Sequence, residues 1–415
     1  MPAAASALDR FGAPTPVLNP TPGPGESFGR AVALEADTLV VGSCRDDLGS
    51  ANAGAVYIFK ASTGELEHTL TNPTPAGFDS FGCAVDISNK TVVVGAADDD
   101  GDGDAAGIAY FFSAASGELL HTLRNPARNS TSPAGNRFGA AVAIDGDLAV
   151  IGAPNDDTGA GSSGQAHVFN VDTGTLEETL PNPSPAENDR FGSAVAMRGD
   201  TALIGTPGDA VVSEPFTEPG AGSVSVYSAR SGNLLQVINN PSADTSDSFG
   251  DAVAIGDNHL VVGAPRDNTG DLDSGAVYLF DRTSFEFKLT LLNPVPSAAA
   301  GFGASVALSD EILAVAAPSD IDLIVDSGTV YLFSLLDGQL FQTLKSPTPA
   351  PVSAFSNVFG ADLAISDNAL VVGDSVDDQG ASDTGAVYVF TQPKLDIATL
   401  WLLLRPSPED PADED

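Results

Sequence analysis

Hydrophobic residues occur in short runs separated by stretches rich in Gly, Pro, Asp and Ser, and the same order of runs repeats along the chain. Short apolar runs bounded by turn residues predict β-strands, and the pattern argues against long helices. The most regular marker is a Phe-Gly pair, which recurs at intervals of 53, 57, 53, 58, 53 and 57 residues. The seven copies are Phe28-Gly29, Phe81-Gly82, Phe138-Gly139, Phe191-Gly192, Phe249-Gly250, Phe302-Gly303 and Phe359-Gly360.

The third repeat shows the plan of every unit. Its first apolar run alternates around small residues and ends at Asp145-Gly146, a strong signal for a two-residue hairpin. Its second run is continuously apolar, as expected of a strand buried on both faces. A loop rich in Asp, Gly and Ser comes next, and the last run closes with Asn182-Pro183, where proline ends the strand at an outer edge. The predicted strands are 138–144, 148–152, 165–169 and 176–180.

Seven such units predict an all-β fold. A four-stranded sheet cannot bury both of its faces alone, but sheets stacked face to face around an axis can. We therefore predict a seven-bladed β-propeller of four-stranded antiparallel blades. The recurrent Phe is expected to wedge between blades, and the Gly to permit close backbone approach. A linear solenoid of β-repeats is the competing topology, and ring closure separates the two.

A surplus outer-strand signal indicates how the ring closes. The ending Leu-x-Asn-Pro-x-Pro of the fourth strand, for example at 180–185, occurs once more before the first repeat, at 18–22. A related copy, 404–408, follows the seventh repeat, so eight candidates exist for seven positions. We predict that residues 15–20 pair into the last blade and close the ring. The apolar segment 398–404 would then be an extra strand, a cover or a contact for another protein.

These residues resemble the FG-GAP repeat family, the seven-bladed propeller of integrin α subunits and of many bacterial surface and secreted proteins. The third and fifth repeats contain both the Phe-Gly and the Gly-Ala-Pro sequences that give the family its name, the latter as Gly152-Ala153-Pro154 and Gly263-Ala264-Pro265. The first, second and seventh repeats depart from this pattern. The resemblance covers about residues 11–391 and implies a propeller, whereas propellers host adhesion, scaffolding and catalysis alike. The expected organisation is a flexible segment 1–14, the propeller 15–391, and a C-terminal strand with an acidic tail at 392–415.

Charge narrows the range of partners. The chain has 56 acidic and 17 basic side chains, a formal net charge of −39, and 42 of its acids are Asp. Such a charge repels nucleic acids and anionic lipid surfaces, so we expect neither nucleic-acid binding nor membrane insertion. Asp is both a turn former and an oxygen ligand for hard cations, so the same bias suits either calcium-binding loops or a solvated, salt-tolerant surface.

Acidic residues gather in the loop between the second and third strands. Integrin-type repeats often carry their calcium loop between the first and second strands, which here is short, so those sites cannot be transferred. The richest acidic loop, 98–104, reads Asp-x-Asp-x-Asp-Gly and predicts calcium as a possible cofactor. The fifth repeat carries a weaker version, for which turns that bond their own backbone are the alternative. The candidate metal ligands are Asp98, Asp100, Asp102, Asp104, Asp267, Asp271 and Asp273.

No catalytic set or organic cofactor motif is recognised. The four histidines are scattered, two of them (His68 and His121) at matching repeat positions, and no nucleophile elbow, zinc-protease pair or phosphate loop occurs. Cys44 and Cys83 are expected near the same face of adjacent blades, where they form either a disulfide or two buried thiols.

The expected function is a non-enzymatic binding and adhesion module, secreted or on the cell surface, that presents loops to a protein or glycan. No signal peptide is recognisable in the first ten residues. The alternatives are a polysaccharide-acting propeller enzyme and a structural subunit of a larger assembly. The oligomeric state is left open.

Overall fold

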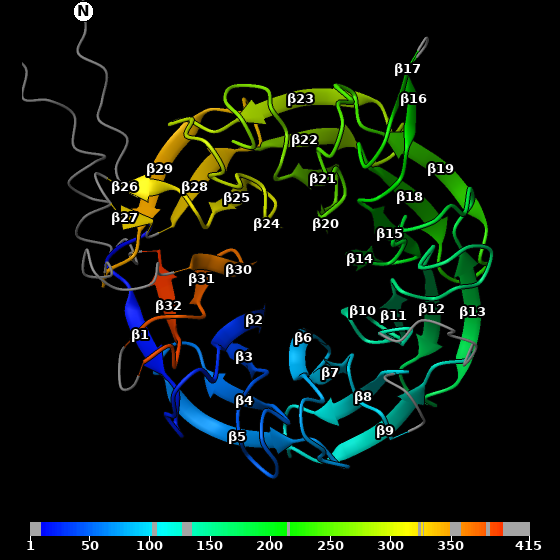
Figure 1. The fold of residues 1–415 in the computed structure, drawn as a ribbon. Coiled ribbons are helices and arrows are strands. Elements are labelled where there is room, and N and C mark those ends of the chain that lie inside the picture. Colours follow the sequence, from blue (N-terminus) through cyan, green and yellow to red (C-terminus); the bar gives the residue numbers. More distant parts are fainter. Residues whose placement is uncertain are drawn as a thin grey trace, which may run out of the picture.

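The computed structural model describes residues 10–101, 106–126, 135–213, 216–322, 325–326, 328–348, 358–378 and 382–392. These residues form seven four-stranded antiparallel sheets, arranged as blades around a central axis (Figure 1). Within the described ranges the fold is all-β, and no helix long and apolar enough to span a membrane occurs there. The innermost strand of blade 1 contacts those of blades 2 and 7, so the ring is closed and the linear solenoid is excluded.

Each blade is a meander in which consecutive strands pair from the axis outward. Blades 1 to 3 contain β2 (Phe28–Glu35), β3 (Thr38–Ser43), β4 (Ala55–Lys60) and β5 (Glu65–Thr71); β6 (Phe81–Ser88), β7 (Thr91–Ala96), β8 (Ile108–Ser113) and β9 (Leu119–Arg124); and β10 (Ala141–Asp145), β11 (Leu148–Ala153), β12 (Gln165–Asn170) and β13 (Leu176–Pro181). Blades 4 and 5 contain β14 (Val195–Arg198), β15 (Thr201–Thr206), β18 (Ser223–Ser228) and β19 (Leu234–Asn239); and β20 (Ala252–Ile255), β21 (His259–Ala264), β22 (Ala276–Asp281) and β23 (Phe287–Leu292). Blades 6 and 7 contain β24 (Ser305–Leu308), β25 (Ile312–Ala317), β28 (Thr329–Ser334) and β29 (Leu340–Lys345); and β30 (Phe359–Ile365), β31 (Ala369–Asp374) and β32 (Ala386–Thr391), completed by β1 (Thr15–Leu18).

The core lies between neighbouring blades. Phe81 is fully buried and shares a cluster with Val40 and Ile58 of blade 1, while its ring lies 5.8 Å from that of Tyr110 of blade 2. Gly82 has φ +87°, and a Cβ atom on Gly42 of blade 1 would lie 1.9 Å from the Gly82 carbonyl oxygen. Both expectations are confirmed: the Phe fills the space between blades, and two glycines let the backbones touch.

The predicted closing strand is confirmed. β1 runs antiparallel to β32, from Thr15 opposite Val389 to Leu18 opposite Ala386, and Val17 is buried at 2% exposure. In Figure 1 this segment lies on the outside of blade 7. The last blade therefore takes three strands from one end of the chain and its outer strand from the other. Segment 398–404, with the rest of the tail, lies outside the described residues.

The chain docks earlier than the expected limit of a flexible segment 1–14. Phe11 is 2% exposed and packs into the core between blades 6 and 7. Its backbone N–H donates to Oε1 of Gln342 at 3.0 Å, and Nε2 of Gln342 donates to the Phe11 carbonyl at 2.8 Å. The boundary was placed too late because a lone Phe carries no strand pattern, although a buried aromatic side chain removes a large apolar area from water.

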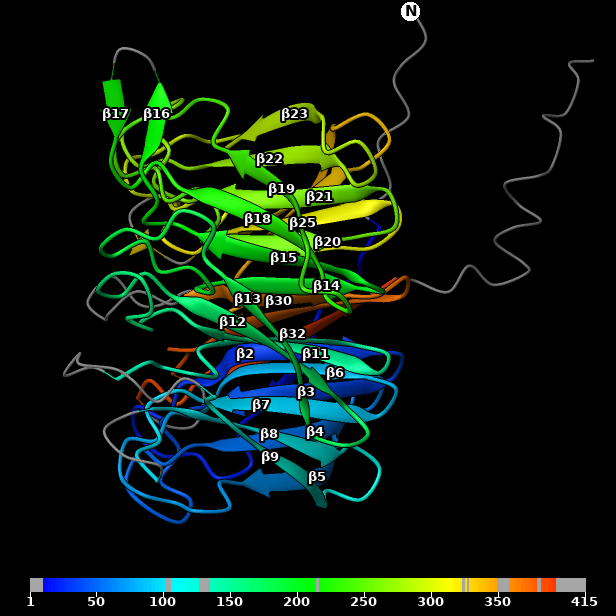
Figure 2. The ribbon, with the colours of Figure 1, turned by 90° about the vertical axis from the view of Figure 1, so that its right-hand side faces the viewer.

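One side of the ring carries the long loops. The loops between second and third strands and the connections between blades emerge together on this side, which we call the loop face; in blade 2 these segments are 97–101, 106–107 and 72–80. Blade 4 adds a hairpin of β16 (Val211–Ser213) and β17 (Phe216–Glu218), which lies on the loop-face side and projects beyond the outer rim of the ring (Figure 1 and Figure 2). Blade 6 has a smaller pair, β26 (Ile321–Asp322) and β27 (Val325–Asp326).

Candidate functional site

In six of the seven blades, the acidic loop of the loop face contains a buried aspartate, and the corresponding Asp209 of blade 4 is partly buried. In blade 2 it is Asp99, whose Oδ2 accepts hydrogen bonds from the Tyr110 hydroxyl at 3.2 Å and from Nδ2 of Asn72 at 3.3 Å. Its Oδ1 accepts from the backbone N–H of Gly101 at 2.8 Å, so this aspartate bonds the backbone of its own loop. Asp99 therefore ties the loop to β8 and to the preceding blade connection.

The same arrangement recurs around the ring. The hydroxyls of Tyr57, Tyr331 and Tyr388 donate to Asp46, Asp320 and Asp377 at 2.7, 2.5 and 2.8 Å, and Tyr278 donates to Asp267. Burial raises the pKa of Tyr57, Tyr110, Tyr278 and Tyr388, so these hydroxyls stay protonated and able to donate. Blade 3 has His167 in place of the tyrosine, and burial lowers its pKa to about 4. These aspartates have a structural role.

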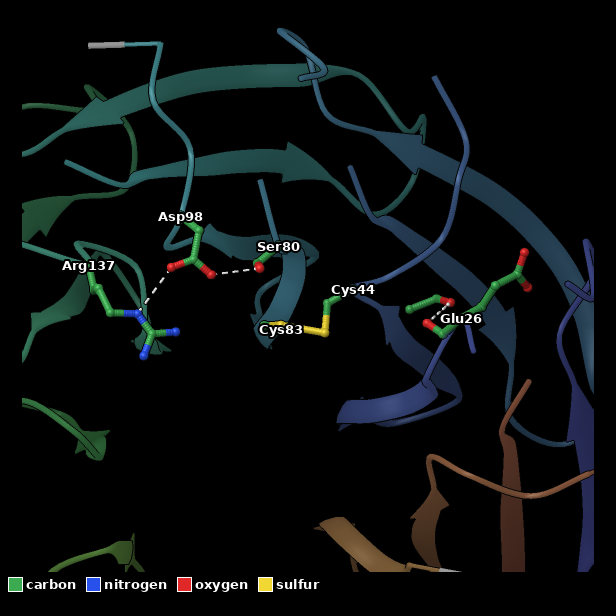
Figure 3. Close-up of a disulfide and its surroundings, with 7 residues drawn as sticks. Glu26, Cys44, Ser80, Cys83, Asp98 and Arg137 are labelled. Atoms are coloured by element: carbon green, nitrogen blue, oxygen red, sulfur yellow. Dashed lines mark hydrogen bonds and ion pairs between the residues drawn. A yellow bond between two sulfur atoms is a disulfide. The ribbon is translucent and has the colours of Figure 1, made fainter. Parts of the chain in front are cut away.

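The sequence-predicted ligands in blade 2 lie on either side of Asp99. Asp98 Oδ2 accepts a hydrogen bond from the Ser80 hydroxyl at 2.7 Å, and its Oδ1 pairs with Nε of Arg137 in blade 3 at 3.2 Å (Figure 3). Asp100 is exposed. Asp102 and Asp104 lie outside the described residues. Calcium binding by this loop therefore stays a prediction.

In blade 5 the predicted ligands do not converge. Asp267 is buried, with Oδ2 bonded to Tyr278 and Oδ1 accepting from the Thr269 N–H at 2.7 Å. Asp271 is exposed and accepts from the adjacent Leu272 N–H, while the N–H of Asp273 donates to the side chain of Asn268. Among all described residues, no group of three or more His, Cys, Asp or Glu side chains could hold a metal ion.

A second layer of buried carboxylates supports the connections between blades. Asp79, two residues before Phe81, accepts from Nδ2 of Asn72 at 2.7 Å and from the Ala76 N–H at 2.6 Å. Burial, and then the negative charges of Asp99 and Asp100, raise the pKa of Asp79 to about 6. Asp247 occupies the same position in blade 5, where burial raises its pKa to about 7. We did not predict these groups from the sequence.

A disulfide joins the first two blades beside the axis. Cys44, directly after β3, bonds to Cys83 in β6 across a Cα–Cα distance of 4.8 Å, and the two are 39 positions apart in sequence (Figure 3). Of the two alternatives that the sequence left open, the structure shows the cross-link. Cys83 also lines the central cavity, so the bond lies at the inner edge of the loop face.

The axis of the propeller holds a cavity of about 490 Å³ lined by the first strands of the blades. Its wall is largely Ala and Val, with Arg30, Asp251 and Asp362 as charged members. Asp362 of blade 7 accepts from the Val32 N–H of blade 1 at 2.9 Å, and Asp86 of blade 2 accepts from the Ile144 N–H of blade 3 at 2.9 Å. Burial raises the pKa of both carboxyl groups, to about 7 for Asp86. Each acts as a side-chain bridge between neighbouring innermost strands.

Two histidines also make repeated contacts between blades. The Nε2 atom of His68 lies 3.2 Å from the Ala115 carbonyl oxygen of blade 2, and that of His121 lies 2.9 Å from the Asp172 carbonyl oxygen of blade 3. Both therefore hold the turn before the fourth strand of the next blade. Their matched positions support the structural role expected for a repeated residue.

Comparison with known proteins agrees with this geometry. The FG-GAP repeat pattern matches residues 22–59, 65–112, 131–169, 177–227, 238–280 and 350–390, which together are more than half of the chain. The matches cover six blades; blade 6 has Ala316 where blades 3 and 5 have the glycine of Gly-Ala-Pro. A comparison with curated proteins finds no match. The chain therefore belongs to the FG-GAP repeat family, as a seven-bladed propeller of the integrin α type.

Proposed function

We propose that the protein is a non-enzymatic binding module, secreted or on the cell surface, whose loop face holds a protein or glycan partner. The FG-GAP propeller fold is compatible with a binding module. The observation that carries the proposal is the asymmetry of the loop face. Five of the loops use one carboxylate each in the repeated Tyr–Asp hydrogen bond, whereas the β16–β17 hairpin of blade 4 has no counterpart of its size among the described residues.

The disulfide supports the proposed location. Disulfides form and persist in oxidising compartments and are rare in the cytosol. Cys44 and Cys83 are the only cysteines in the sequence, and they come from different blades that the fold brings together. An adhesive role outside the cell is consistent with a ring that is cross-linked beside its binding face.

Two variants on opposite faces test the role of the loop face. In the first, residues 211–218 are replaced by Gly-Ser so that the β16–β17 hairpin is lost. In the control, Arg230→Ala removes the exposed ion pair with Asp147 on the opposite face. Arrays of glycans and of extracellular proteins should give signals that the control retains and the hairpin variant loses. Signals absent for the unaltered protein, or unchanged by loss of the hairpin, would overturn the proposal.

We also propose that the 98–104 loop binds calcium. The support is chemical: several carboxylates in one turn suit a hard cation, and the side chain of Asp100 is exposed. Calorimetric titration of chelator-treated protein should show heat and a raised melting temperature that Asp100→Asn weakens. The paired variant Asp271→Asn reports on the weaker loop of blade 5. No heat and no stabilisation at millimolar calcium would remove the metal from the proposal.

A further inference from the structure

Basic side chains gather at one point of this acidic molecule. Asp251 follows the Phe-Gly pair of blade 5, at the mouth of the central cavity on the loop face, and its side chain is solvent-exposed there. Desolvation by the surrounding protein raises the pKa of the Asp251 carboxyl group, while the positive charges of Arg266, Arg190 and Arg30 oppose this shift. Asp251 shares the wall of the central cavity with Arg30 of blade 1, and the wall of a second pocket with Arg190 of blade 4 and Arg266 of blade 5.

Two of these arginines, Arg190 and Arg266, lack an ion-pair partner within the described part of the chain. A comparison with Arg137 explains why Arg190 has no such partner. Both residues directly precede a Phe-Gly pair, but Arg137 faces Asp98 of the preceding blade, whereas the residue equivalent to Asp98 in blade 3 is Asn155. The guanidinium of Arg190 is therefore left without the carboxylate that its counterpart has.

A pocket of about 350 Å³ lies beside these groups, between blades 4 and 5. Its wall includes Arg190, Arg266, Asp251 and the base of the β16–β17 hairpin at Pro219 and Gly220. Gly208, which also lines the pocket, occupies the position of Asp98 in blade 2, and no side chain fits there because a Cβ atom would lie 2.0 Å from the Asn188 carbonyl oxygen. Neither the hairpin nor this glycine recurs with the arginines in another described blade, so the pocket is not a by-product of the repeat.

The chemistry of the wall restricts the ligand. Guanidinium groups match a carboxylate through paired N–H donors. Asp251 would repel a bare anion, but it accepts hydrogen bonds from hydroxyl groups, as do the hydroxyls of Ser246 and Ser248 on the same wall. The net charge of −39 disfavours densely charged polyanions. A small group with one carboxylate and several hydroxyls satisfies all three conditions, and the volume falls at the lower end of ligand pockets.

We propose that this pocket binds a uronic acid residue of an acidic glycan. The carboxylate of the sugar lies against Arg190 and Arg266, and its hydroxyls donate to Asp251 and exchange hydrogen bonds with the two serines. This inference rests on the proposed function, because it assigns a partner to the same loop face. A uronic acid differs from the corresponding neutral sugar only in having a carboxylate in place of the terminal CH₂OH group. The two arginines, which bind that carboxylate, therefore distinguish the acidic sugar from the neutral one.

Calorimetry with the full chain tests the proposal. The probes are glucuronate-containing and galacturonate-containing oligosaccharides, their neutral glucose and galactose counterparts, and acetate, sulfate and inorganic phosphate. One of the two uronides should bind at least tenfold more tightly than its neutral counterpart. Arg190→Gln and Arg266→Gln should each weaken that binding at least tenfold, whereas the matched control Arg137→Gln should leave it within twofold. Asp251→Asn should weaken the uronide but strengthen acetate.

Several outcomes would overturn the proposal. They are equal binding of uronide and neutral sugar, binding unaffected by Arg190→Gln, tighter binding of sulfate or phosphate than of any uronide, and no binding of either uronide. Melting curves of all variants identify any that fail to fold, and the Arg266→Gln variant gives a second reading if Arg190→Gln is lost. If the arrays still give hairpin-dependent signals while uronides fail, the ligand assignment is wrong and the binding module remains.

Discussion

Removing the side chain of Phe11 should loosen the closure of the ring. Phe11 is 2% exposed and lies outside the repeats, in a cluster that includes Phe359 and Leu332 of blades 7 and 6. Replacing a buried Phe by Ala destabilises a protein by about 3–5 kcal/mol, through lost burial and the cavity that remains. Roughly 350 described residues at about 2.1 cal/mol/K each give an unfolding entropy near 0.7 kcal/mol/K, so Phe11→Ala should lower the melting temperature by about 5 °C.

Differential scanning calorimetry with the variant and a matched control measures this effect. Phe78→Ala removes the same side chain from a position that is 69% exposed, and we expect its melting temperature to change by less than about 1 °C. Deletion of residues 1–22 should have a larger effect than Phe11→Ala, because it also removes Val17 and the ladder to β32. Equal melting temperatures for the Phe11 and Phe78 variants, or an unchanged curve after the deletion, would refute the reasoning.

Three further predictions concern stability. The Cys44–Cys83 disulfide closes a loop of 39 residues, and its reduction should lower the free energy of unfolding by about 4 kcal/mol according to the chain-entropy relation. A Cys44→Ser/Cys83→Ser variant should have a lower melting temperature that does not change with reductant. An unaltered protein whose melting temperature is the same with and without reductant would contradict this prediction. Asp86, Asp247 and Asp374 have pKa values raised by burial to about 7, so the folded state binds more protons than the unfolded state between about pH 4 and 7, and stability falls as pH rises. Melting temperatures should be higher at pH 5 than at pH 8, and Asp247→Asn or Asp374→Asn should reduce this difference. A melting temperature that rises with pH, or that does not change, would contradict the prediction. Tyr278→Phe should destabilise by about 1–3 kcal/mol in urea unfolding, because buried Asp267 loses a donor, and a loss below about 0.5 kcal/mol would show that the bond contributes little.

The architecture was predictable because each Phe-Gly pair marks a contact that the packing repeats. The second strand of blade 3 was predicted at 148–152 and observed as Leu148–Ala153, since a continuous apolar run can only be buried. The first strand was predicted from Phe138 but begins at Ala141. In blades 1 and 2, where the equivalent glycines have a positive φ like that of Gly139, the strand does begin at the Phe but its register shifts after it, so the apolar pattern does not determine where the ladder starts.

The candidate site was harder to predict because spacing within a loop does not tell which carboxylate points inward. The alternating reading singled out Asp98 and Asp100, whereas Asp99 between them is the buried residue. Its orientation depends on Tyr110, eleven residues later and on the adjacent strand. The same interval of 11 separates Asp46 from Tyr57 and Asp267 from Tyr278, so an Asp-to-Tyr repeat was the signal that could have revealed the network.

The net charge of the chain gave no indication of the pocket lined by Arg190 and Arg266. A net charge of −39 describes the average field, and it led the sequence interpretation towards cations. Arg190 and Arg266 are 76 positions apart, and only the ring brings their two blades together. Whether an arginine has an ion-pair partner depends on a residue of the neighbouring blade, as Asp98 and Asn155 show for Arg137 and Arg190.

The pairing of β1 with β32 also determines how the ring would respond to mechanical load. The two strands are antiparallel, so the chain enters β1 at Thr15 beside the end of β32, where Val389 lies opposite. A force that pulls the chain before Phe11 away from the segment after Thr391 would first break the Phe11–Gln342 hydrogen bonds and would then open the four residue pairs of this ladder one after another. Such unzipping needs less force than shearing, in which all pairs bear the load together. Tethers at both ends would make the seventh blade the first part of the ring to open.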